Sequence, residues 1–381
     1  MRQRAMKGEE LSLPARMLLA LLGRALGGND ISTALFEKAT EADWRSCYRL
    51  AIGQGVMAIA WDGVTTLSPS IFPPRTLKLE WAVAVERYEQ RYAHYCHTVH
   101  ELTEFFQPYG IGLMQLKGVG FSTYYPIPAH REGGDIDIRL YSLDLSNMSD
   151  EEARLKGEQL IKEQGIHISS DHSEKHNEFH YNGILIESHK SFLNTYNTPE
   201  AQAMEEFLQK QSEPVETVLM EGEYSINVPS DSFNAVFIGF HAAQHYIQGL
   251  ALHHLCDWAC MLKHGGLQLL PAEIMDPKVM RFIHALTGLS YEYLGTSDVV
   301  NFDRKYAHAI LLEMINPPYS IEKGETIKNS AWHTFVFKTK RFIHRHKKVN
   351  TVFTISLANR LKEVYKNNIG NPARLFHLTG K

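Results

Sequence analysis

The spacing of hydrophobic residues changes twice along the chain, from helical periodicity to strict alternation and back. Over residues 1–108 apolar side chains recur at intervals of three and four, and the longest such stretch is 76–106. Residues 109–228 carry short alternating runs between Gly, Asn and Pro, which is typical of strands and turns. Residues 229–381 return to helical spacing. The pattern predicts an α+β fold in which a small mixed β-sheet with flanking helices lies between an N-terminal and a C-terminal helical region.

Shorter elements follow from the same two periodicities. Helical spacing places helices over 16–23, 44–52, 56–66, 150–164, 233–249, 271–286, 303–315 and 326–347. Alternation places strands over 111–116, 135–140, 166–169, 178–181, 184–189, 217–220 and 224–228. These boundaries divide the chain into three predicted units, 1–108, 109–228 and 229–381.

One alternating run carries acids on its polar face. Residues two apart on a strand share a face, so Asp135 and Asp137 point one way while Ile136 and Ile138 point into a core. Two adjacent carboxylates repel unless a cation lies between them, and such oxygen ligands suit Mg²⁺ together with substrate phosphates. For an isolated pair of acids a solvated strand face is the simpler explanation. The neighbouring segments therefore decide between a solvated face and a metal site.

A hairpin signal adds a third acid. Asn182-Gly183 lies between two alternating runs and predicts a two-residue turn. This turn pairs Glu178 with Glu187, and Glu187 then lies on a strand next to the predicted acidic strand. We therefore expect Glu187 to reach a site built on the two aspartates.

Upstream of the acids, an apolar run over 111–116 ends at Lys117-Gly118-Val119-Gly120. This arrangement predicts a strand, a tight turn and the start of a helix through Tyr124. Helix N-termini expose unpaired amides that bind phosphate, glycine permits close approach of the backbone, and lysine adds a positive charge. An ordinary strand-to-helix turn explains the same residues equally well when they are taken alone.

Together these segments resemble the nucleotidyltransferases of the polymerase-β superfamily, and within it the family described as uncharacterised nucleotidyltransferases. The resemblance rests on Leu116-Lys117-Gly118, Tyr125-Pro126, Arg131 and Asp135-Ile136-Asp137-Ile138, with a looser match at His241, His245 and Leu255-Cys256-Asp257. It implies a nucleotidyltransferase-type sheet over 109–228 as the catalytic core.

The resemblance also implies roles for six residues. Asp135, Asp137 and Glu187 would be the catalytic acids and the ligands of Mg²⁺ or Mn²⁺, and the nucleotide-binding residues would be Lys117, Gly118 and Arg131. Arg131 lies in the loop before the acidic strand, where a guanidinium can brace a triphosphate bidentately. The alternative for Arg131 is an ion pair with Glu132.

The implied reaction moves a nucleoside monophosphate from a nucleoside triphosphate, with ATP as the expected donor, to an acceptor hydroxyl or phosphate. Two Mg²⁺ ions about 3.5–4 Å apart would bridge the attacking and leaving oxygens, and pyrophosphate would leave. The acceptor is not defined by the sequence, and a small molecule, peptide or protein is favoured over RNA. His180 shares a hairpin face with Glu187 and is either a base or a packed histidine.

Two other functions fit parts of the sequence. A catalytically silent, regulatory member of the fold would bind nucleotide without turnover. A metal-dependent phosphohydrolase would use His241, His245, His254 and Asp257, although histidines lining a core or cleft explain this pattern more simply. A basic stretch over 338–348 is either a solvated helix face or a docking surface for RNA or a phosphorylated acceptor.

Composition narrows the setting without naming a substrate. The net charge of −4 over 381 residues shows no global bias toward nucleic acid or acidic membranes. No apolar run approaches the roughly 18 residues of a membrane span, so no membrane partner is expected. The four cysteines, Cys47, Cys96, Cys256 and Cys260, are expected to be buried free thiols, which fits a reducing cytoplasm.

Overall fold

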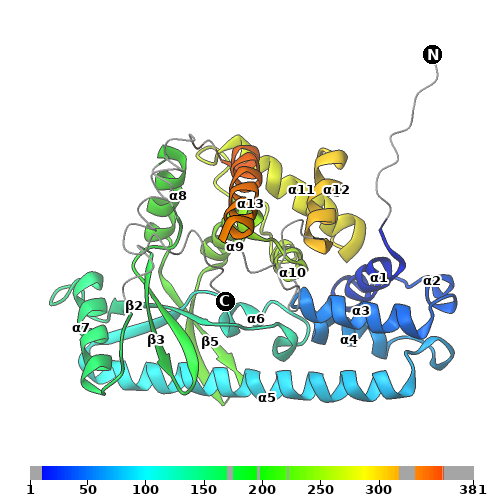
Figure 1. The fold of residues 1–381 in the computed structure, drawn as a ribbon. Coiled ribbons are helices and arrows are strands. Elements are labelled where there is room, and N and C mark those ends of the chain that lie inside the picture. The colour runs from blue at the N-terminus through cyan, green and yellow to red at the C-terminus, as the bar shows by residue number, and fades with distance from the viewer. Residues whose placement is uncertain are drawn as a thin grey trace.

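A six-stranded mixed sheet in the order β3-β4-β2-β1-β6-β5 forms the centre of the fold (Figure 1). The computed structural model describes residues 11–169, 175–194, 198–220, 223–316, 331–353 and 355. The strands are β1 (Ile111–Gln115), β2 (Ile136–Ser142), β3 (His176–Tyr181), β4 (Ile184–His189), β5 (Pro214–Leu219) and β6 (Tyr224–Pro229). The α+β class that the periodicity predicts is confirmed.

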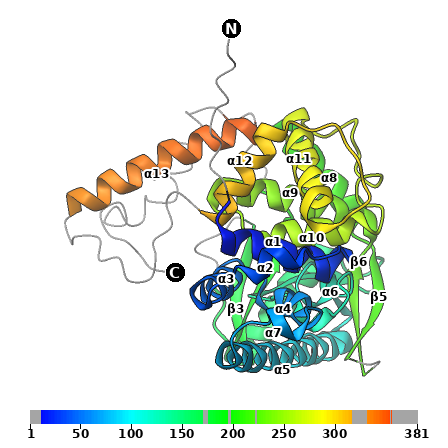
Figure 2. The same cartoon turned by 90° about the vertical axis from the view of Figure 1, so that its right-hand side faces the viewer.

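Helices precede, interrupt and follow the strands. The α-helices are α1 (Leu13–Gly27), α2 (Thr33–Glu37), α3 (Glu41–Gly53), α4 (Met57–Thr65), α5 (Arg75–Phe106), α6 (Val119–Ser122), α7 (Asp150–Glu163), α8 (Pro199–Lys210), α9 (Asp231–Gln248), α10 (Leu252–Leu262), α11 (Pro277–Leu294), α12 (Arg304–Ile315) and α13 (Ala331–Val352). Three short 3₁₀ turns are η1 (Pro69–Ile71), η2 (Gln107–Tyr109) and η3 (Pro128–His130). The last helix extends away from the body of the molecule (Figure 2).

Strand pairing brings two of the predicted acids side by side. β2 is antiparallel to β1 and parallel to β4, and in the parallel pair Asp137 lies directly opposite Glu187. The β3–β4 hairpin has the predicted register, with Glu178 opposite Glu187. Its turn residues Asn182 and Gly183 have φ values of 50° and 75°, which a two-residue hairpin turn of this kind requires. The Asn-Gly signal therefore sets which side chains on β4 face the site.

The apolar face of the sheet is covered by α5 and α7 (Figure 1). Ile136 and Ile138 of β2 join Leu102 and Phe106 of α5 and Ala153 of α7 in one buried cluster. This is the alternation predicted for the acidic strand, with the carboxylates left on the opposite face. In Figure 1, α9 and α10 lie on the side of the sheet that carries the carboxylates, opposite α5.

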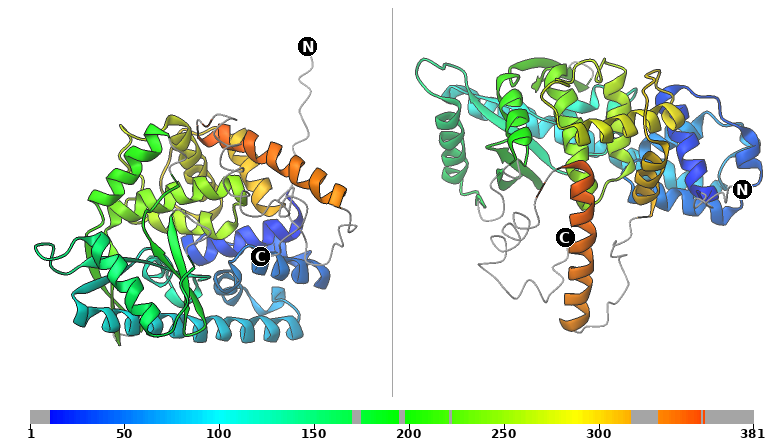
Figure 3. Two further views of the ribbon diagram at one scale, coloured as in Figure 1. Left: turned by 60° about the vertical axis from the view of Figure 1, so that its left-hand side comes forward. Right: turned by 90° about the horizontal axis from the view of Figure 1, so that it is seen from above.

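The N-terminal and C-terminal helices share a second hydrophobic cluster. Leu18 and Leu22 of α1 belong to the same cluster as Phe282 and Leu286 of α11, and α1 packs against both α4 and α11. The two views in Figure 3 show the N-terminal helices next to the C-terminal group. Gly27 allows the close approach, because a Cβ there would collide with the backbone of α11. The boundaries near 108 and 228 stay a prediction, since helices from both ends of the chain pack together.

Several element bounds differ from the prediction. The helix expected over 271–286 is α11, which begins at Pro277 after the capping side chain of Asp276 and continues to Leu294. α8 was not predicted, although Thr198 caps it and Pro199 opens it. The strand expected over 166–169 is reduced to one bridge between Ser169 and Glu178. α6 ends at Ser122 rather than Tyr124. The start expected for the last helix, near 326, lies outside the described residues.

Two compositional predictions concern cysteines and membranes. All four cysteines are free and buried, as expected, and burial raises the pKa of Cys47 to about 12. Over the part of the chain that the structure describes, none of the helices has the length and apolar character needed to cross a bilayer.

Candidate active site

Asp135, Asp137 and Glu187 meet at the centre of the sheet, and we call them the carboxylate cluster. One oxygen from each lies within 4.8 Å of the others. Asp137 and Glu187 are neighbours on β2 and β4, while Asp135 directly precedes β2. The side chain of Asp137 is only 1% exposed, against 34% for Asp135 and 15% for Glu187. The three predicted acids are therefore brought together with one open edge at Asp135.

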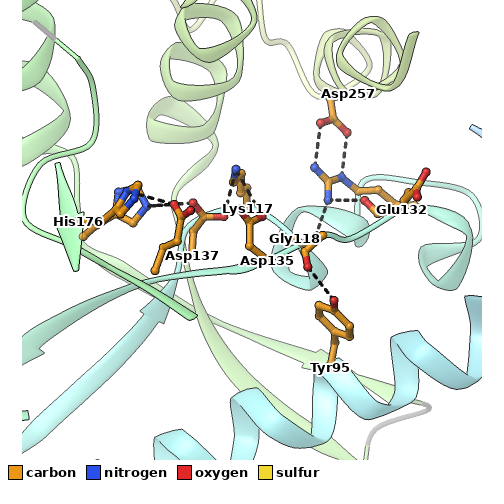
Figure 4. A network of polar contacts seen from close by, with 12 residues as sticks. Tyr95, Lys117, Gly118, Glu132, Asp135, Asp137, His176 and Asp257 are labelled. Atoms are coloured by element: carbon orange, nitrogen blue, oxygen red, sulfur yellow. Dashed lines mark hydrogen bonds and ion pairs between the residues drawn. The ribbon is translucent and has the colours of Figure 1, made fainter. Parts of the chain in front are cut away.

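Lys117 lies between the two aspartates (Figure 4). Its Nζ is 3.2 Å from Oδ2 of Asp137 and 3.9 Å from Oδ1 of Asp135. From the other side, Nε2 of His189 donates to Oδ1 of Asp137 at 2.9 Å. The Nδ1 of His189 lies 3.0 Å from the carbonyl oxygen of Ser191, which holds the ring in place. The most buried carboxylate thus has a cation or donor on each oxygen.

The surroundings shift the pKa values of the three carboxyls in different directions. Burial alone would raise the pKa of Asp137, but the charge of Lys117 and the hydrogen bond from His189 outweigh it, and the pKa is lowered. Burial also opposes ionisation of Glu187, and contact with His189 again lowers the pKa. For Asp135, burial and the charge of Asp137 raise the pKa. Asp135 is consequently the member that most needs a further cation to stay ionised.

Two more basic residues at the start of β3 face the cluster, and no sequence motif singles them out. Nδ1 of His176 is 3.1 Å from Oε2 of Glu187, and its Nε2 is 3.2 Å from Glu178. Burial lowers the pKa of Lys175, an effect that the negative charges of Asp137 and Glu187 only partly offset. The available signal is the hairpin register, which places His176 opposite His189 and on the face of Glu187.

The turn after β1 is shaped by glycine and a buried glutamine. Gly118 has φ of 65° and ψ of −131°, a conformation that L side chains rarely adopt. A Cβ at this position would lie 2.5 Å from Nε2 of Gln115. Oε1 of Gln115 accepts the backbone N–H of Gly120 at 2.8 Å. Because α6 is a single turn and one of its first amides is already bonded, fewer amides face outward than the motif suggests.

Arg131 is held by an acid from the C-terminal helices. Its Nε and Nη2 donate to the two carboxylate oxygens of Asp257 on α10, both at 2.9 Å (Figure 4). Nη1 reaches the carbonyl oxygen of Gly118 at 3.2 Å, and Tyr125 donates to Asp257 at 2.6 Å. The alternative of a side-chain pair with Glu132 is wrong, since Arg131 contacts only the Glu132 carbonyl. The phosphate-binding role of Arg131 stays a prediction, and its observed contacts fix the Gly118 turn.

Tyrosines of α5 hold the loop that leads into β2. Tyr95 donates to the carbonyl oxygen of Gly134 at 2.9 Å (Figure 4). Tyr88 donates to Oε1 of Glu132 at 2.7 Å. These two hydroxyls therefore hold Glu132 and Gly134, the loop residues that shortly precede Asp135.

His180 does not take part in the cluster. It lies opposite Leu185 on β3 and is solvent-exposed, so the interpretation of His180 as a packed histidine is wrong. The histidine that contacts Glu187 on this face is His176, four residues earlier.

The basic stretch of 338–348 lies on α13. Within it, Lys338 and Lys348 are partly buried while Lys340 and Lys347 are exposed.

The histidines of the rival interpretation also come together, but without Asp257. Ligand nitrogens of His241, His245 and His254 lie within 4.8 Å of one another, and we call these three residues the histidine cluster. Asp257 points instead to Arg131 and Tyr125.

Two surface cavities lie away from the carboxylate cluster. The cavity of about 360 Å³ is lined by α11 and the segment before α12, and the cavity of about 530 Å³ is lined by residues near the start of β1, the end of β2 and α7. Neither lining includes a member of the carboxylate cluster.

A family model of uncharacterised nucleotidyltransferases matches residues 40–295, more than half of the chain. The chain belongs to this family of nucleotidyltransferases. The matched residues contain the whole sheet, the carboxylate cluster and the Arg131–Asp257 pair. Neither a curated protein nor a solved structure matches the chain. Membership supports a transferase at the general level, as the sequence resemblance implied.

Proposed function

We propose that this nucleotidyltransferase moves a nucleoside monophosphate from a nucleoside triphosphate, with ATP as the donor, to an acceptor hydroxyl or phosphate and releases pyrophosphate. The observation that carries the proposal is the pairing of Asp137 with Glu187 on adjacent parallel strands, with Asp135 beside them and one oxygen of each within 4.8 Å. Polymerase-β-type chemistry requires such a set of acids on neighbouring strands.

The donor set fits a hard divalent cation. All three side chains offer oxygen, which Mg²⁺ and Mn²⁺ prefer, and none of the three is a soft ligand. Oδ2 of Asp137 is buried and accepts no hydrogen bond from the described residues, although the Lys117 ammonium is 3.2 Å away. Asp135, Asp137 and Glu187 would hold two such ions. When bound, the ions would stabilise charge on the reacting phosphoryl oxygens and favour ionisation of the acceptor hydroxyl.

The protein's own contribution is charge and position. The ammonium of Lys117, already directed between the aspartates, would neutralise phosphate oxygens that enter the site. Lys175 adds a second, partly buried side chain with an amine, whose pKa responds to the same acids. Arg131 would donate to the Gly118 carbonyl and so hold the turn in a position where it can contact a bound triphosphate. Phosphoryl transfer depends on positioning and electrostatic stabilisation, so no covalent protein nucleophile is required.

The acceptor follows from the surface only in broad terms. We place a small molecule, peptide or protein ahead of RNA, because the overall charge is negative and the basic stretch that would favour RNA is confined to the one helix α13. The chemistry at the acceptor is nucleophilic attack by an oxygen in line with the departing pyrophosphate.

The test is to incubate the full-length protein with each α-labelled nucleoside triphosphate, Mg²⁺ and cell extract. We expect Mg²⁺-dependent pyrophosphate release and a labelled acceptor. Asp137→Asn should lower the rate by about 10³-fold, because it removes several kcal/mol of metal-based stabilisation. Glu216→Gln, which neutralises an exposed acid on the edge strand β5, is the matched control and should retain the rate.

Two outcomes would contradict the proposal. Unchanged turnover in Asp137→Asn would show that the chemistry lies elsewhere. Tight binding of Mg·ATP by the wild-type protein with no pyrophosphate release under any acceptor fraction would instead favour a catalytically silent nucleotide-binding protein.

A further inference from the structure

The histidine cluster lies on two helices outside the sheet. His241 and His245 are one turn apart on α9, and His254 comes from the first turn of α10. The ring centroids are 4.3 Å apart for His241 and His245, 4.6 Å for His245 and His254, and 5.9 Å for His241 and His254. One nitrogen from each ring lies within 4.8 Å of the others. Three imidazoles from two helices therefore face a common point.

The rings are unusual in how few polar partners they have. Neither ring nitrogen of His241 or His245 forms a hydrogen bond with any residue that the structure describes. Nδ1 of His254 lies 3.3 Å from the carbonyl oxygen of Ala251. The backbone N–H of Ala251 also points to this Nδ1, at 3.2 Å, so Nδ1 accepts in one ring tautomer and donates to the carbonyl in the other. In the tautomer that donates to the carbonyl, Nε2 has a free lone pair, the arrangement found when a metal-bound histidine is oriented by the backbone. Among the described residues, the rings of His241 and His245 thus keep nitrogens that accept no hydrogen bond, while His254 is held through its Nδ1.

Burial also acts on the charge of the three rings. Burial lowers the pKa of His245 to about 3, and the charges of Lys117 and His253 act in the same direction. Burial likewise lowers the pKa values of His241 and His254 well below the ordinary range. Neutral imidazole is the form of histidine that binds metals.

Neighbouring polar residues do not complete or block the cluster. Asp257 is committed to Arg131 and Tyr125. His253 lies 3.9 Å from His254 between ring centroids, but its Nδ1 faces the carbonyl oxygen of Gln54. The donor set is therefore three nitrogens and no carboxylate, which is unlike the carboxylate cluster in every ligand.

We propose that His241, His245 and His254 form a binding site for a transition-metal ion, best suited to Zn²⁺. Imidazole ligands select Zn²⁺ and its neighbours over Mg²⁺. Zn–N distances of about 2.0–2.1 Å require ligand nitrogens about 3.4 Å apart in a tetrahedral site, so the rings need to approach by no more than about 1.5 Å. Three protein ligands leave a fourth position for water or an anion. This site is separate from the Mg²⁺ site of the proposed function and does not depend on it.

The test uses Co²⁺ as a spectroscopic substitute for Zn²⁺ in the metal-stripped, full-length protein. Excess Mg²⁺ is present throughout, so that the carboxylate cluster is occupied. We expect one Co²⁺ per chain with the intense visible absorption of a tetrahedral nitrogen site, and stoichiometric bleaching of this absorption by Zn²⁺. His245→Asn and His241→Asn should each lower the affinity for Co²⁺ by at least about tenfold to a hundredfold.

Controls separate this site from other histidines. His284→Asn changes a partly buried histidine on α11, and Glu187→Gln changes the other candidate metal cluster, which includes His176 and His189. Both variants should keep the tetrahedral spectrum, and circular dichroism checks the fold of each. Two results would overturn the proposal. One is a wild-type protein that gives no tetrahedral absorption. The other is a spectrum that disappears with Glu187→Gln but survives in the folded His245→Asn and His241→Asn variants.

Discussion

The carboxylate cluster and the histidine cluster are two potential ion sites built on opposite principles. The carboxylate cluster is charged, lies on adjacent strands, and has Lys117 and His189 already paired with its most buried acid. The histidine cluster is neutral, lies on two helices, and has few hydrogen-bond partners among the described residues. Burial is common to both, so burial alone does not decide whether a group is charged.

The difference shows how partners control a buried charge. Asp137 is fully buried yet its pKa is lowered, because two basic groups contact its oxygens. His245 forms no ion pair with an acid among the described residues, and burial lowers its pKa to about 3 although the charge of Asp137 opposes this. A buried group keeps its charge only where an opposite charge or a donor offsets the loss of solvation. The two regions should consequently prefer different cations, hard ions at the carboxylates and transition metals at the imidazoles.

The Arg131–Asp257 pair links the two regions, and breaking it should have the largest effect on stability. Asp257→Ala leaves the buried guanidinium of Arg131 without its bidentate partner, and we expect the free energy of unfolding to fall by about 3–5 kcal/mol. Urea denaturation measures this loss. The double variant Arg131→Met, Asp257→Leu should recover much of it, because no unpaired charge remains. If the free energy of unfolding fell by less than about 1 kcal/mol in Asp257→Ala, the contact between Arg131 and α10 would not be important for stability.

A smaller effect is expected from the histidine that orients Asp137. His189→Asn removes the donor to Oδ1 of Asp137, and Mg²⁺ affinity should fall by about 10-fold to 100-fold. Isothermal titration with Mg²⁺ in the presence of ATP gives the affinity. His180→Asn, on the same hairpin but solvent-exposed, is the matched control. Equal affinities in the two variants would mean that His189 only fills space.

The smallest expected effect is a change in the pH dependence of stability caused by His130, whose pKa is raised while burial lowers the pKa values of the histidine cluster. Burial acts to lower the pKa of His130, but its contacts with Asp62 and Glu89 outweigh burial and raise the pKa. A raised pKa adds stability below the unfolded value of about 6.5, and this stability is lost as pH rises through the folded value. The slope is at most about 1.4 kcal/mol per pH unit for one proton.

The corresponding measurement is urea denaturation at several pH values above 6.5. His130→Gln should flatten the pH dependence in this range, while His284→Gln, whose pKa is lowered by burial, should leave it as in the wild type. The histidines of the cluster have lowered pKa values in the folded protein, so their contribution has the opposite sign and fades as pH rises above the unfolded value of about 6.5. An unchanged pH dependence in His130→Gln would contradict the assignment.

Local signals made the acidic face of the sheet predictable. Alternation assigned Asp135 and Asp137 to one face of a strand, and Asn182-Gly183 set the register that brings Glu187 to the site. Both signals act over a few residues, so they can be read without knowing the fold. The helices α7 and α9 were predictable for the same reason, since their capping side chains and periodicity are local, and α5 was predictable from its periodicity.

The other features of the site depend on contacts between residues that are far apart in the sequence. His189 and Asp137 are 52 residues apart, and Arg131 and Asp257 are 126 apart, so no local pattern predicts either contact. Nor does periodicity indicate that helices from both ends of the chain share one core. The electrostatic coupling of the partly buried Lys175 to Asp137 and Glu187 also emerges only when β3 is placed against β4.

The central claim is that the carboxylate cluster is the site that binds hard divalent cations. The most direct measurement is anomalous X-ray scattering from crystals of the full-length protein soaked with Mn²⁺ and a non-hydrolysable nucleoside triphosphate. We predict anomalous density between Asp135, Asp137 and Glu187, and its loss in Asp137→Asn crystals treated in the same way. Mn²⁺ density confined to His241, His245 and His254, with none at the three carboxylates, would contradict the account.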